Sequence, residues 1–549
     1  MVDELSAYDG DLLDGRYDCV DRIVLNAYNT VCYSAGGFRT WWRRLKNGEE
    51  DTLDNAHLMR MAGRFSRRVR AYAKAHDIPV VECARGERKH EIAEEHLSTH
   101  PEVRGLFLIL VSRAVAPVWE IERSAAGRIR NISGKKPYVN HYSFHIMDPE
   151  WGHLTIKMSG HPPCGAQIIL NGHAYVAAQA CQAGIAFTKE GTCFTHLSNA
   201  TSLARIADTL SEEPTIGRLT RVCERWIYSS CLFFALDPDE QQRSGFRYDY
   251  AVYQVEDSRH LLFRVGGQME QVFQGLIDRT RAHLQVPHLR TIFGAAKRPR
   301  QAKAGPAPRL AVVVETPTYD VTVFKLHVGT LTLKAYTKGE HVLRFEAIVH
   351  NTKALGCGRV VAKFPQIVAR LGTMIERFLT TLHAVDQAFV SDDTLEHLPL
   401  PSMVGQTRVG GVDLNKARMR ALLAAVLTLA PAPQGFRVAD VAAQVQAMTG
   451  QTAEAYGTRH AAYDLKKLRA KRLVEMVPSS RRYRVPPAGV RTIAALVILR
   501  DKVIKPILAG TAKPKIGRKP KTWSPVDEHY ETIRKDMQLL FEDLGLAGA

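Results

Sequence analysis

The chain has 549 residues, of which 45% are hydrophobic and 24% are charged, a composition typical of a globular protein and not of a disordered one. A chain of this length exceeds one ordinary core, so roughly three or four domains are expected. The formal net charge of +18 favours a polyanionic partner, and nucleic acid is the commonest polyanion. The acidic N-terminus and the absence of a membrane-length apolar run predict a cytoplasmic protein with no membrane partner.

Residues 1–100 are predicted to be mainly helical and to contain one strongly basic helix between His57 and Lys74. Spacings of four, seven and eight residues place four arginines on one face of that helix. They are Arg60, Arg64, Arg67 and Arg68. A ridge of guanidinium groups at this pitch suits a phosphate backbone, and the alternative is a solvated basic face.

Residues 101–296 are predicted to form the first part of a mixed α/β core. The runs LFLILV, YSFHIM, LTIKM and AQIIL read as strands, and the turn DPEWG joins the second and third of them as a hairpin. The helix AYVAAQACQAG follows and ends at Gly184. A further strand, FRYDYAVYQVE, precedes another helix, so strands and helices alternate through this segment.

A basic, proline-rich linker or loop is predicted at residues 297–309, because KRPRQAKAGPAPR has no apolar periodicity. Residues 310–400 then read as a hairpin-rich second part of the core plus a long helix. The fold class expected from these patterns is α+β, with a mixed α/β core built on an antiparallel sheet.

Residues 410–500 are predicted to form a separate winged helix-turn-helix, because two helices, a basic helix and a strand-turn-strand follow one another. Nine basic residues of the third helix and the hairpin are candidate contacts with DNA or RNA. They are Arg459, Lys466, Lys467, Arg469, Lys471, Arg472, Arg481, Arg482 and Arg484. The alternative is a protein-docking module. Residues 501–549 read as a basic tail with a terminal helix.

Three carboxylates near the ends of predicted strands form the best candidate metal site. Asp148, Glu256 and Glu346 come from separate strands, and carboxylate oxygens are suitable ligands for Mg²⁺ or Mn²⁺ in phosphodiester chemistry. The alternative is that Asp148 belongs to a turn and that Glu346 pairs with a neighbouring cation. The nucleotide-binding and nucleophile-elbow motifs are missing from the sequence, so no nucleotide or organic cofactor is expected.

The most specific arrangement is the hairpin LTLKAYTKGEHVLRFEAIV. Lys334, Tyr336 and Lys338 alternate along one strand and therefore project from one face. Glu346 and Arg344 alternate on the returning strand. A tyrosine between two lysines is expected to have a stabilised phenolate, which suits attack on a phosphodiester or contact with a phosphate. The alternative is an ordinary cross-strand Lys–Glu pair.

Histidines 141, 145, 153, 161 and 173 also invite a metal interpretation. His141 and His145 share strand parity but lie about 13 Å apart along a strand, too far to share one ion unaided. Satisfied polar or stacking histidines are the preferred interpretation.

Two resemblances to known protein families rest on the segments quoted below. A large group of uncharacterised bacterial proteins often found with mobile elements is resembled by the segment PEWGHLTIKMSGHPPCGAQIILNGH, the YQVE segment, the Lys-x-Tyr-x-Lys and Leu-Arg-x-Glu hairpin and the C-terminal winged helix. That resemblance covers most of residues 100–500 and implies no established activity. Residues 331–351 alone resemble the Tyr-x-Lys and Arg-x-Glu segment of rolling-circle replication initiators of plasmids. This second resemblance implies a nucleophilic Tyr336 and a divalent metal at Glu346.

Together these patterns favour a DNA-processing protein of a mobile element that nicks, cleaves or joins a strand. Under that hypothesis Tyr336, Lys338 and Glu346 are the catalytic candidates, and Lys334 contacts nucleic acid. Two other hypotheses stay open, a non-catalytic protein that binds DNA or RNA and a transcriptional regulator that uses only its last domain.

Overall fold

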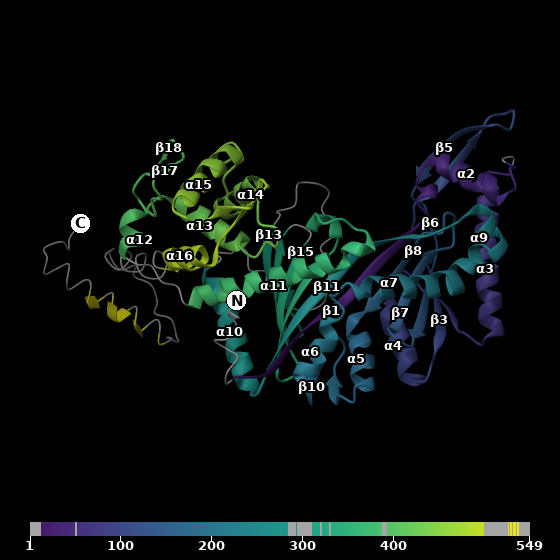
Figure 1. Cartoon of the computed structure of the whole chain (residues 1–549), viewed down its shortest axis with the longest axis horizontal. Coiled ribbons are helices and arrows are strands. Elements are labelled where there is room, and N and C mark those ends of the chain that lie inside the picture. The colour runs from purple at the N-terminus through teal and green to yellow at the C-terminus, as the bar shows by residue number, and fades with distance from the viewer. Residues whose placement is uncertain are drawn as a thin grey trace. The chain divides into compact units, whose positions relative to one another are not determined.

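The computed structural model describes residues 12–49, 52–283, 292–293, 310–318, 321–328, 331–386 and 392–498, and a few residues between 525 and 536. The chain divides into two compact units (Figure 1). The core unit holds the described residues up to Met269 and those between Thr330 and Thr373. The C-terminal unit holds most of the others. Within the described ranges, none of the helices combines the length and apolar character that a membrane crossing requires.

The core unit is built on one large, mostly antiparallel sheet with the strand order β15-β16-β11-β1-β8-β7-β6-β3-β2. Among these nine described strands, β2 and β3 are the only pair that runs in parallel. The mixed α/β class with an antiparallel sheet is therefore as predicted. The strands are β1 (Leu13–Tyr28), β2 (Val80–Glu82), β3 (Gly105–Val115), β6 (Tyr138–Asp148), β7 (Gly152–Ser159), β8 (Ala166–Asn171), β11 (Asp249–Phe263), β15 (Leu331–Lys338) and β16 (Val342–Val349).

The first 100 residues contain the predicted helices but begin with a strand that the prediction missed. β1 runs for 16 residues and lies between β11 and β8 in the middle of the sheet. Asp14, Arg16 and Asp18 alternate along the strand, but the adjacent charges Asp21 and Arg22 break that alternation, so the period-two pattern of a strand is obscured. The tertiary pairing, and not local periodicity, therefore decides the conformation of this segment.

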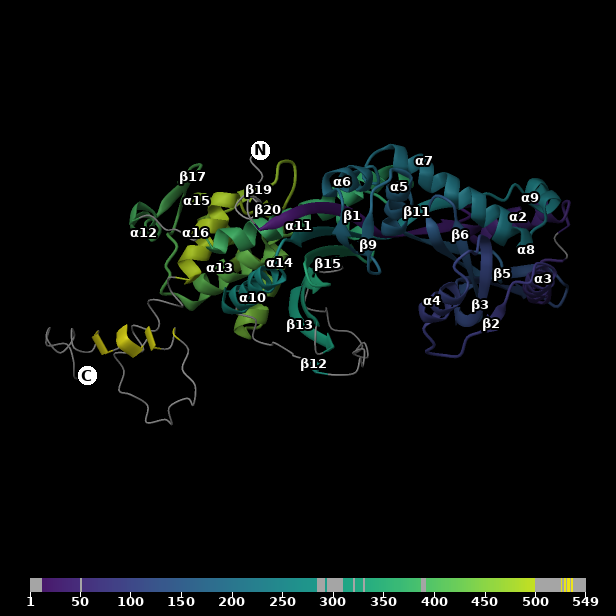
Figure 2. The ribbon, with the colours of Figure 1, turned by 90° about the horizontal axis from the view of Figure 1, so that it is seen from below.

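Helices and two small hairpins complete the core unit. The helices are α2 (Ala35–Leu45), α3 (Asn55–Ala75), α4 (Lys89–Thr99), α5 (Gly172–Gln182), α6 (Ala200–Asp208), α7 (Pro214–Cys223), a π-helix (Glu224–Leu232), α8 (Phe233–Ala235) and α9 (Pro238–Ser244), with 3-10 turns at Val31–Tyr33, Thr352–Leu355 and Val361–Lys363. The hairpins pair β4 (Val118–Arg123) with β5 (Ile129–Lys135) and β9 (Phe187–Lys189) with β10 (Phe194–Leu197). Figure 2 shows α5, α6 and α7 lying together on one side of the strands. Phe65 of α3 packs against Tyr142 of β6 and Phe234 of α8, which extends the apolar core.

The C-terminal unit contains short strands and a group of helices. β13 (Leu310–Thr318) pairs antiparallel with β14 (Val321–Val328) and parallel with β12 (Ile292–Phe293). The remaining elements are α12 (Asp392–His397), β17 (Ser402–Val404), β18 (Thr407–Val409), α13 (Ala417–Leu429), α14 (Val438–Thr449), α15 (Thr458–Ala470), β19 (Glu475–Met476), β20 (Tyr483–Arg484) and α16 (Pro487–Ile498). Two long helices, α10 (Gly266–His283) and α11 (Phe364–Asp386), extend across the division between the units.

The segment from α13 to β20 has the predicted order of three helices and a hairpin. Phe436, just before α14, forms an isolated antiparallel bridge with Tyr483 of the hairpin. The preceding Gly435 has φ of +73°, and a Cβ atom there would lie 2.2 Å from the carbonyl oxygen of Tyr483. Only glycine fits this close approach, so Gly435 permits the bridge. The predicted linker at 297–309 and most of the tail at 501–549 lie outside the described residues.

Candidate functional site

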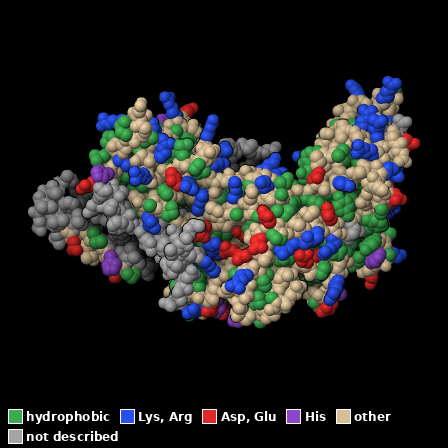
Figure 3. Space-filling view, in the orientation of Figure 1, with side chains coloured by type: hydrophobic (Ala, Val, Ile, Leu, Met, Phe, Trp, Pro, Cys, Tyr) green, Lys and Arg blue, Asp and Glu red, His purple; other side chains and the backbone are tan. Residues whose placement is uncertain are grey.

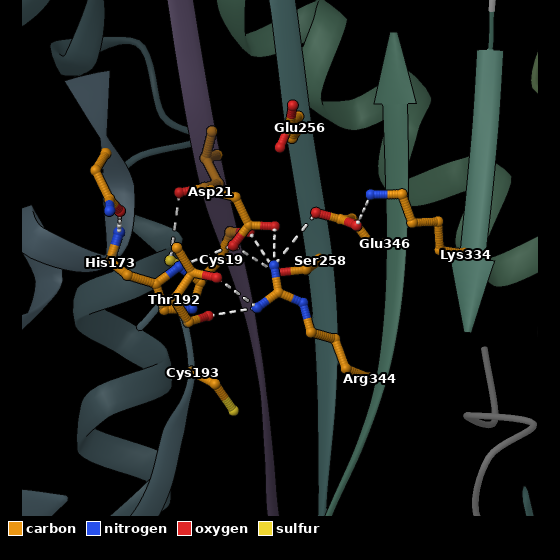
Figure 4. Close-up of polar contacts among 12 residues, drawn as sticks. Cys19, Asp21, His173, Thr192, Cys193, Glu256, Ser258, Lys334, Arg344 and Glu346 are labelled. Atoms are coloured by element: carbon orange, nitrogen blue, oxygen red, sulfur yellow. Dashed lines mark hydrogen bonds and ion pairs between the residues drawn. The ribbon is translucent and has the colours of Figure 1, made fainter. Parts of the chain in front are cut away.

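A buried charged cluster lies where β1, β11 and β16 run side by side (Figure 4). The register of β1 against β11 shifts between Val20 and Arg22, which leaves Asp21 as an extra residue in a β-bulge. Asp21 is only 3% exposed, and the bulge directs its carboxylate toward β16. Bulges commonly re-aim a side chain next to a functional site, and here the re-aimed group is a charge.

Arg344 of β16 is the centre of this cluster and is 1% exposed. Its Nη2 atom lies 2.7 Å from Oδ2 of Asp21 and 3.4 Å from Oε1 of Glu346. Its Nη1 atom donates to the hydroxyl of Thr192 at 2.9 Å and to the Thr192 carbonyl oxygen. An uncompensated buried guanidinium would be costly, so the two carboxylates stabilise it in place.

Glu346 is shared between two cations. Its Oε2 atom accepts a hydrogen bond of 2.7 Å from Nζ of Lys334 on the neighbouring β15, whereas its Oε1 atom faces Arg344. Every residue of β16 is buried, so this hairpin is not a solvated one. The cross-strand Lys–Glu pair that was left open as an alternative is therefore present, but inside the protein.

A histidine from a helix start completes the cluster. His173 is fully buried, and its Nδ1 atom lies 2.8 Å from Oδ1 of Asp21. The preceding Gly172 brings the first turn of α5 against β1, since a Cβ atom there would lie 1.7 Å from the carbonyl oxygen of Val20. Ser258 of β11 also donates to Oδ1 of Asp21, at 3.0 Å. Both oxygens of Asp21 are therefore used within the protein.

The electrostatics of the cluster follow from burial and from these contacts. Burial alone would raise the pKa of Asp21, but Arg344 and His173 lower it, so the carboxylate stays charged. Burial and the neighbouring Glu346 raise the pKa of Glu256, which lies on β11 and accepts a hydrogen bond from Gln254 at 2.6 Å. Both influences favour the protonated form of Glu256.

The expected phenolate character of Tyr336 is wrong. Lys334, Tyr336 and Lys338 do alternate on β15 as predicted. However, burial and the charge of Glu346 raise the pKa of Tyr336 well above its usual range, since Lys334 is paired with Glu346. The guanidinium of Arg344 lies 5.7 Å from the ring centre, and its opposing effect is smaller. The phenol accordingly keeps its proton.

Asp148 does not join the other two predicted metal ligands. Glu256 and Glu346 lie on the neighbouring strands β11 and β16, but Asp148 ends β6, four strands from β11 and hence about 19 Å across the sheet. The four donors that occupy its buried oxygens are the amides of Glu150 and Trp151, the guanidinium of Arg225 and the indole of Trp226. Asp148 orders the turn after β6, so the predicted convergence of all three carboxylates is incorrect.

Two carboxylates of the cluster have their oxygens engaged within the protein. The oxygens of Asp21 and Glu346 already accept from cations or hydroxyl groups. Among the residues that the structure describes, no group of three or more His, Cys, Asp or Glu side chains could hold an ion. Metal binding at Glu256 and Glu346 stays a prediction.

Part of the predicted arginine ridge on α3 is used inside the protein. Arg64 forms a bidentate pair with Glu240 of α9 at 2.7 and 2.9 Å, and Arg68 lies 3.5 Å from Asp237. Arg60 and Arg67 are exposed. The sequence pattern placed the four on one face, but the packing of α9 against that face was not visible in the sequence.

The basic residues of α15 and the β19–β20 hairpin differ in how far they are engaged. Several contact the protein itself: Lys467 pairs with Asp464, Arg469 contacts Met476, Lys471 donates to the carbonyl of His397, Arg482 to that of Gly435, and Arg484 pairs with Glu475. Lys466 is half-buried. Arg459, Arg472 and Arg481 are exposed. Figure 3 shows Lys and Arg side chains over these helices and also over the core unit.

Sequence reasoning missed Asp21 and Thr192 and did not assign a role to Arg344 beyond pairing with Glu346. The one available signal for Asp21 was a carboxylate within the apolar run CVDRIVL. Comparison with known protein families, with curated proteins and with solved structures returns no significant match to the chain.

Proposed function

We propose that this protein binds nucleic acid, and that residues 417–498 do so as a winged helix with α15 as the recognition helix. The support is the order of the elements together with the bridge between Phe436 and Tyr483, which sets a third extended segment beside the β19–β20 hairpin. A winged helix places such a hairpin next to its recognition helix.

The observation that carries the proposal is the positive charge left over on these elements. Arg459 opens α15, Arg472 follows its end and Arg481 lies in the hairpin turn. Exposed guanidinium groups at these places can contact the phosphates on either side of a groove. By contrast Asp464, the one acidic residue of α15, is fully buried and paired with Arg418, so it does not oppose them at the surface.

The test is binding of the full chain to labelled duplex DNA, single-stranded DNA and single-stranded RNA of one sequence, measured by fluorescence anisotropy. The triple variant Arg459→Gln, Arg472→Gln, Arg481→Gln should bind the preferred ligand at least about tenfold more weakly. The matched control is Arg128→Gln, Arg130→Gln, Lys136→Gln, which removes three exposed charges from the core unit. Equal losses in both variants, or no binding by the wild type, would refute the proposal.

Strand cleavage or joining is a second candidate, favoured by one observation. Glu256 and Glu346 lie diagonally on neighbouring strands, and the raised pKa of Glu256 suits a group that accepts or donates a proton. The resemblance of the β15–β16 hairpin to replication initiators points in the same direction. In this candidate Glu256 is the proton-transfer group, and Tyr336, which retains its proton, is a phosphate contact.

Cleavage is tested with single- and double-stranded DNA in Mg²⁺ or Mn²⁺. Glu256→Gln should abolish product formation while the circular dichroism spectrum stays unchanged, and Tyr336→Phe should retain most of the activity. Absence of cleavage of every substrate by the wild type would reject this candidate and leave the binding proposal intact.

A further inference from the structure

One face of the core-unit sheet carries a group of polar side chains on β6, β7 and β8. Ser143 of β6 lies opposite Lys157 of β7, and Lys157 lies opposite Gln167 of β8. His141 and His145 are two residues on either side of Ser143. Because cross-strand partners and alternate residues share a face, all five project from the same side of the sheet.

Two lysines lie on this face without an acidic partner among the described residues. Lys89, at the start of α4, donates a hydrogen bond to Ser112 of β3, whose cross-strand partner is His141. Burial, then Arg22 and Lys89, lower the pKa of Lys157. Both lysines are half-buried, and across the described part of the chain neither has a carboxylate within ion-pair distance. Like charges held together in this way leave a local excess of positive potential.

Two buried polar atoms beside these lysines have no hydrogen-bond partner among the residues that the structure describes. Ser143 is 1% exposed, and its Oγ atom is unpaired. His145 is 3% exposed, and its Nε2 atom is unpaired, whereas its Nδ1 atom lies 3.0 Å from Nε2 of His153. Leaving such groups unpaired costs stability, so an unexplained pair of them points to a missing ligand.

We propose that Lys89, Lys157, Ser143 and His145 form a binding site for a phosphate-type oxyanion. Two ammonium groups match the charge of a dianion, and the hydroxyl of Ser143 supplies a neutral donor. In the tautomer in which His153 donates to Nδ1 of His145, the Nε2 proton of His145 is the second neutral donor. The anion would supply acceptors for both unpaired atoms and for both lysines.

Desolvation keeps His145 neutral, which is the form in which it can donate one proton to the anion. Burial, His153, Lys157 and Lys89 lower the pKa of His145 to about 3, so its ring is neutral at pH 7 and donates one proton. A free phosphate and the terminal phosphate of a nucleic-acid strand offer the same chemistry to these groups. The site uses no residue of α15 or of the β19–β20 hairpin. The proposed phosphate site can therefore be tested independently of the proposed nucleic-acid binding.

The test is isothermal titration of the full chain with inorganic phosphate at low ionic strength. We expect saturable binding of one phosphate, weakened at least about tenfold by Lys157→Gln, because a charged donor is lost. Lys136→Gln, which removes an exposed lysine of the same unit, is the matched control and should bind like the wild type. Absence of saturable binding, or equal affinity in Lys157→Gln and the wild type, would overturn the proposal.

Ser143→Ala separates a binding role from a structural one. Removing a buried, unpaired hydroxyl should leave the Tm of the phosphate-free protein unchanged or raise it, while phosphate affinity falls. A lower Tm with unaltered affinity would show instead that the hydroxyl serves the fold.

A competition experiment identifies the source of the phosphate. Displacement of phosphate by a 5′-phosphorylated oligonucleotide, but not by the unphosphorylated oligonucleotide, supports the terminus of a nucleic-acid strand as the ligand. Displacement by neither oligonucleotide supports a free phosphate.

Discussion

Arg344 shows how a single buried side chain can organise a site. Its guanidinium is contacted by Asp21 from β1, by Glu346 from its own strand and by Thr192 between β9 and β10. Removing one carboxylate partner of a buried cation is strongly destabilising, because it leaves buried charge uncompensated. The three segments are therefore held together by electrostatics as well as by packing.

Replacing Glu346 tests this view. Glu346→Gln should lower the free energy of unfolding by about 2 to 4 kcal/mol, because Arg344 and Lys334 lose their shared negative partner. Urea unfolding followed by circular dichroism measures the change. Glu340→Gln, an exposed change in the turn of the same hairpin, should stay within about 0.5 kcal/mol of the wild type. Similar values for both variants would show that the network contributes little.

His145 and His153 make stability depend on pH. Burial lowers the pKa of His145 to about 3 and that of His153 to about 4. The unfolded chain binds these protons below about pH 6.5, so between pH 6.5 and 4 it holds more protons than the folded protein. Stability therefore falls as the pH falls through this window, by up to about 1.4 kcal/mol per pH unit for each histidine.

The double variant His145→Gln, His153→Gln should flatten that dependence. The free energy of unfolding, measured in urea at several pH values from 4 to 7.5, would fall less steeply with acid than in the wild type. Either single replacement should remove about half of the effect. Parallel curves for the wild type and the double variant would mean that other groups account for the acid sensitivity.

Among the elements, α15 depends on a single buried carboxylate. Asp464 is fully buried and accepts two hydrogen bonds of 2.7 Å from Arg418 of α13 and one of 3.1 Å from Tyr456. These contacts hold α15 against α13. The helix that presents Arg459 is thus positioned by an acidic residue that never reaches the surface.

Asp464→Asn should weaken this attachment by about 2 to 3 kcal/mol, because a buried, charge-assisted bidentate pair is lost. Hydrogen exchange of the full chain should show faster exchange in α13, α14 and α15, with the β6–β7 hairpin of the core unit unchanged. Asp440→Asn, at the start of α14, is the control for a carboxylate that accepts a hydrogen bond from the backbone of Arg437 at the start of its own helix. Unaltered exchange in α15 would contradict the role of Asp464.

For the whole molecule, the excess of positive charge matters more than any one residue. On the face shown in Figure 3, Lys and Arg side chains lie over both units and are not confined to one patch. Exposed charges that neutralise phosphates release counterions, so the logarithm of affinity falls with the logarithm of salt concentration by about 0.9 per phosphate on duplex DNA. The salt dependence therefore measures how much of the charge contacts the ligand.

The triple arginine variant should reduce the magnitude of that slope by roughly 2 to 3, because three phosphate contacts are lost. Anisotropy titrations between about 50 and about 300 mM KCl would measure this slope. A slope near zero for the wild type would mean that the net charge of +18 serves solubility and not recognition.

Local pattern alone was sufficient for several features. The β6–β7 hairpin, β8 with α5, and the alternation of Lys334, Tyr336 and Lys338 follow from period-two patterning and turn residues, which act over a few positions. The helices and hairpin of residues 417–484 follow from the same kind of short-range information. The sequence also contained both members of the Lys334–Glu346 pair and offered their pairing as an alternative.

Only the tertiary structure decided which charged groups meet. The bulge that brings Asp21 to Arg344, the three strands that separate Asp148 from Glu256, and the packing of α9 on Arg64 all depend on strand order and helix packing. So does the protonation of Tyr336, whose pKa burial raises although two lysines flank it in the sequence. Charge interactions depend on distance and burial in space, and neither quantity is encoded in spacing along the chain.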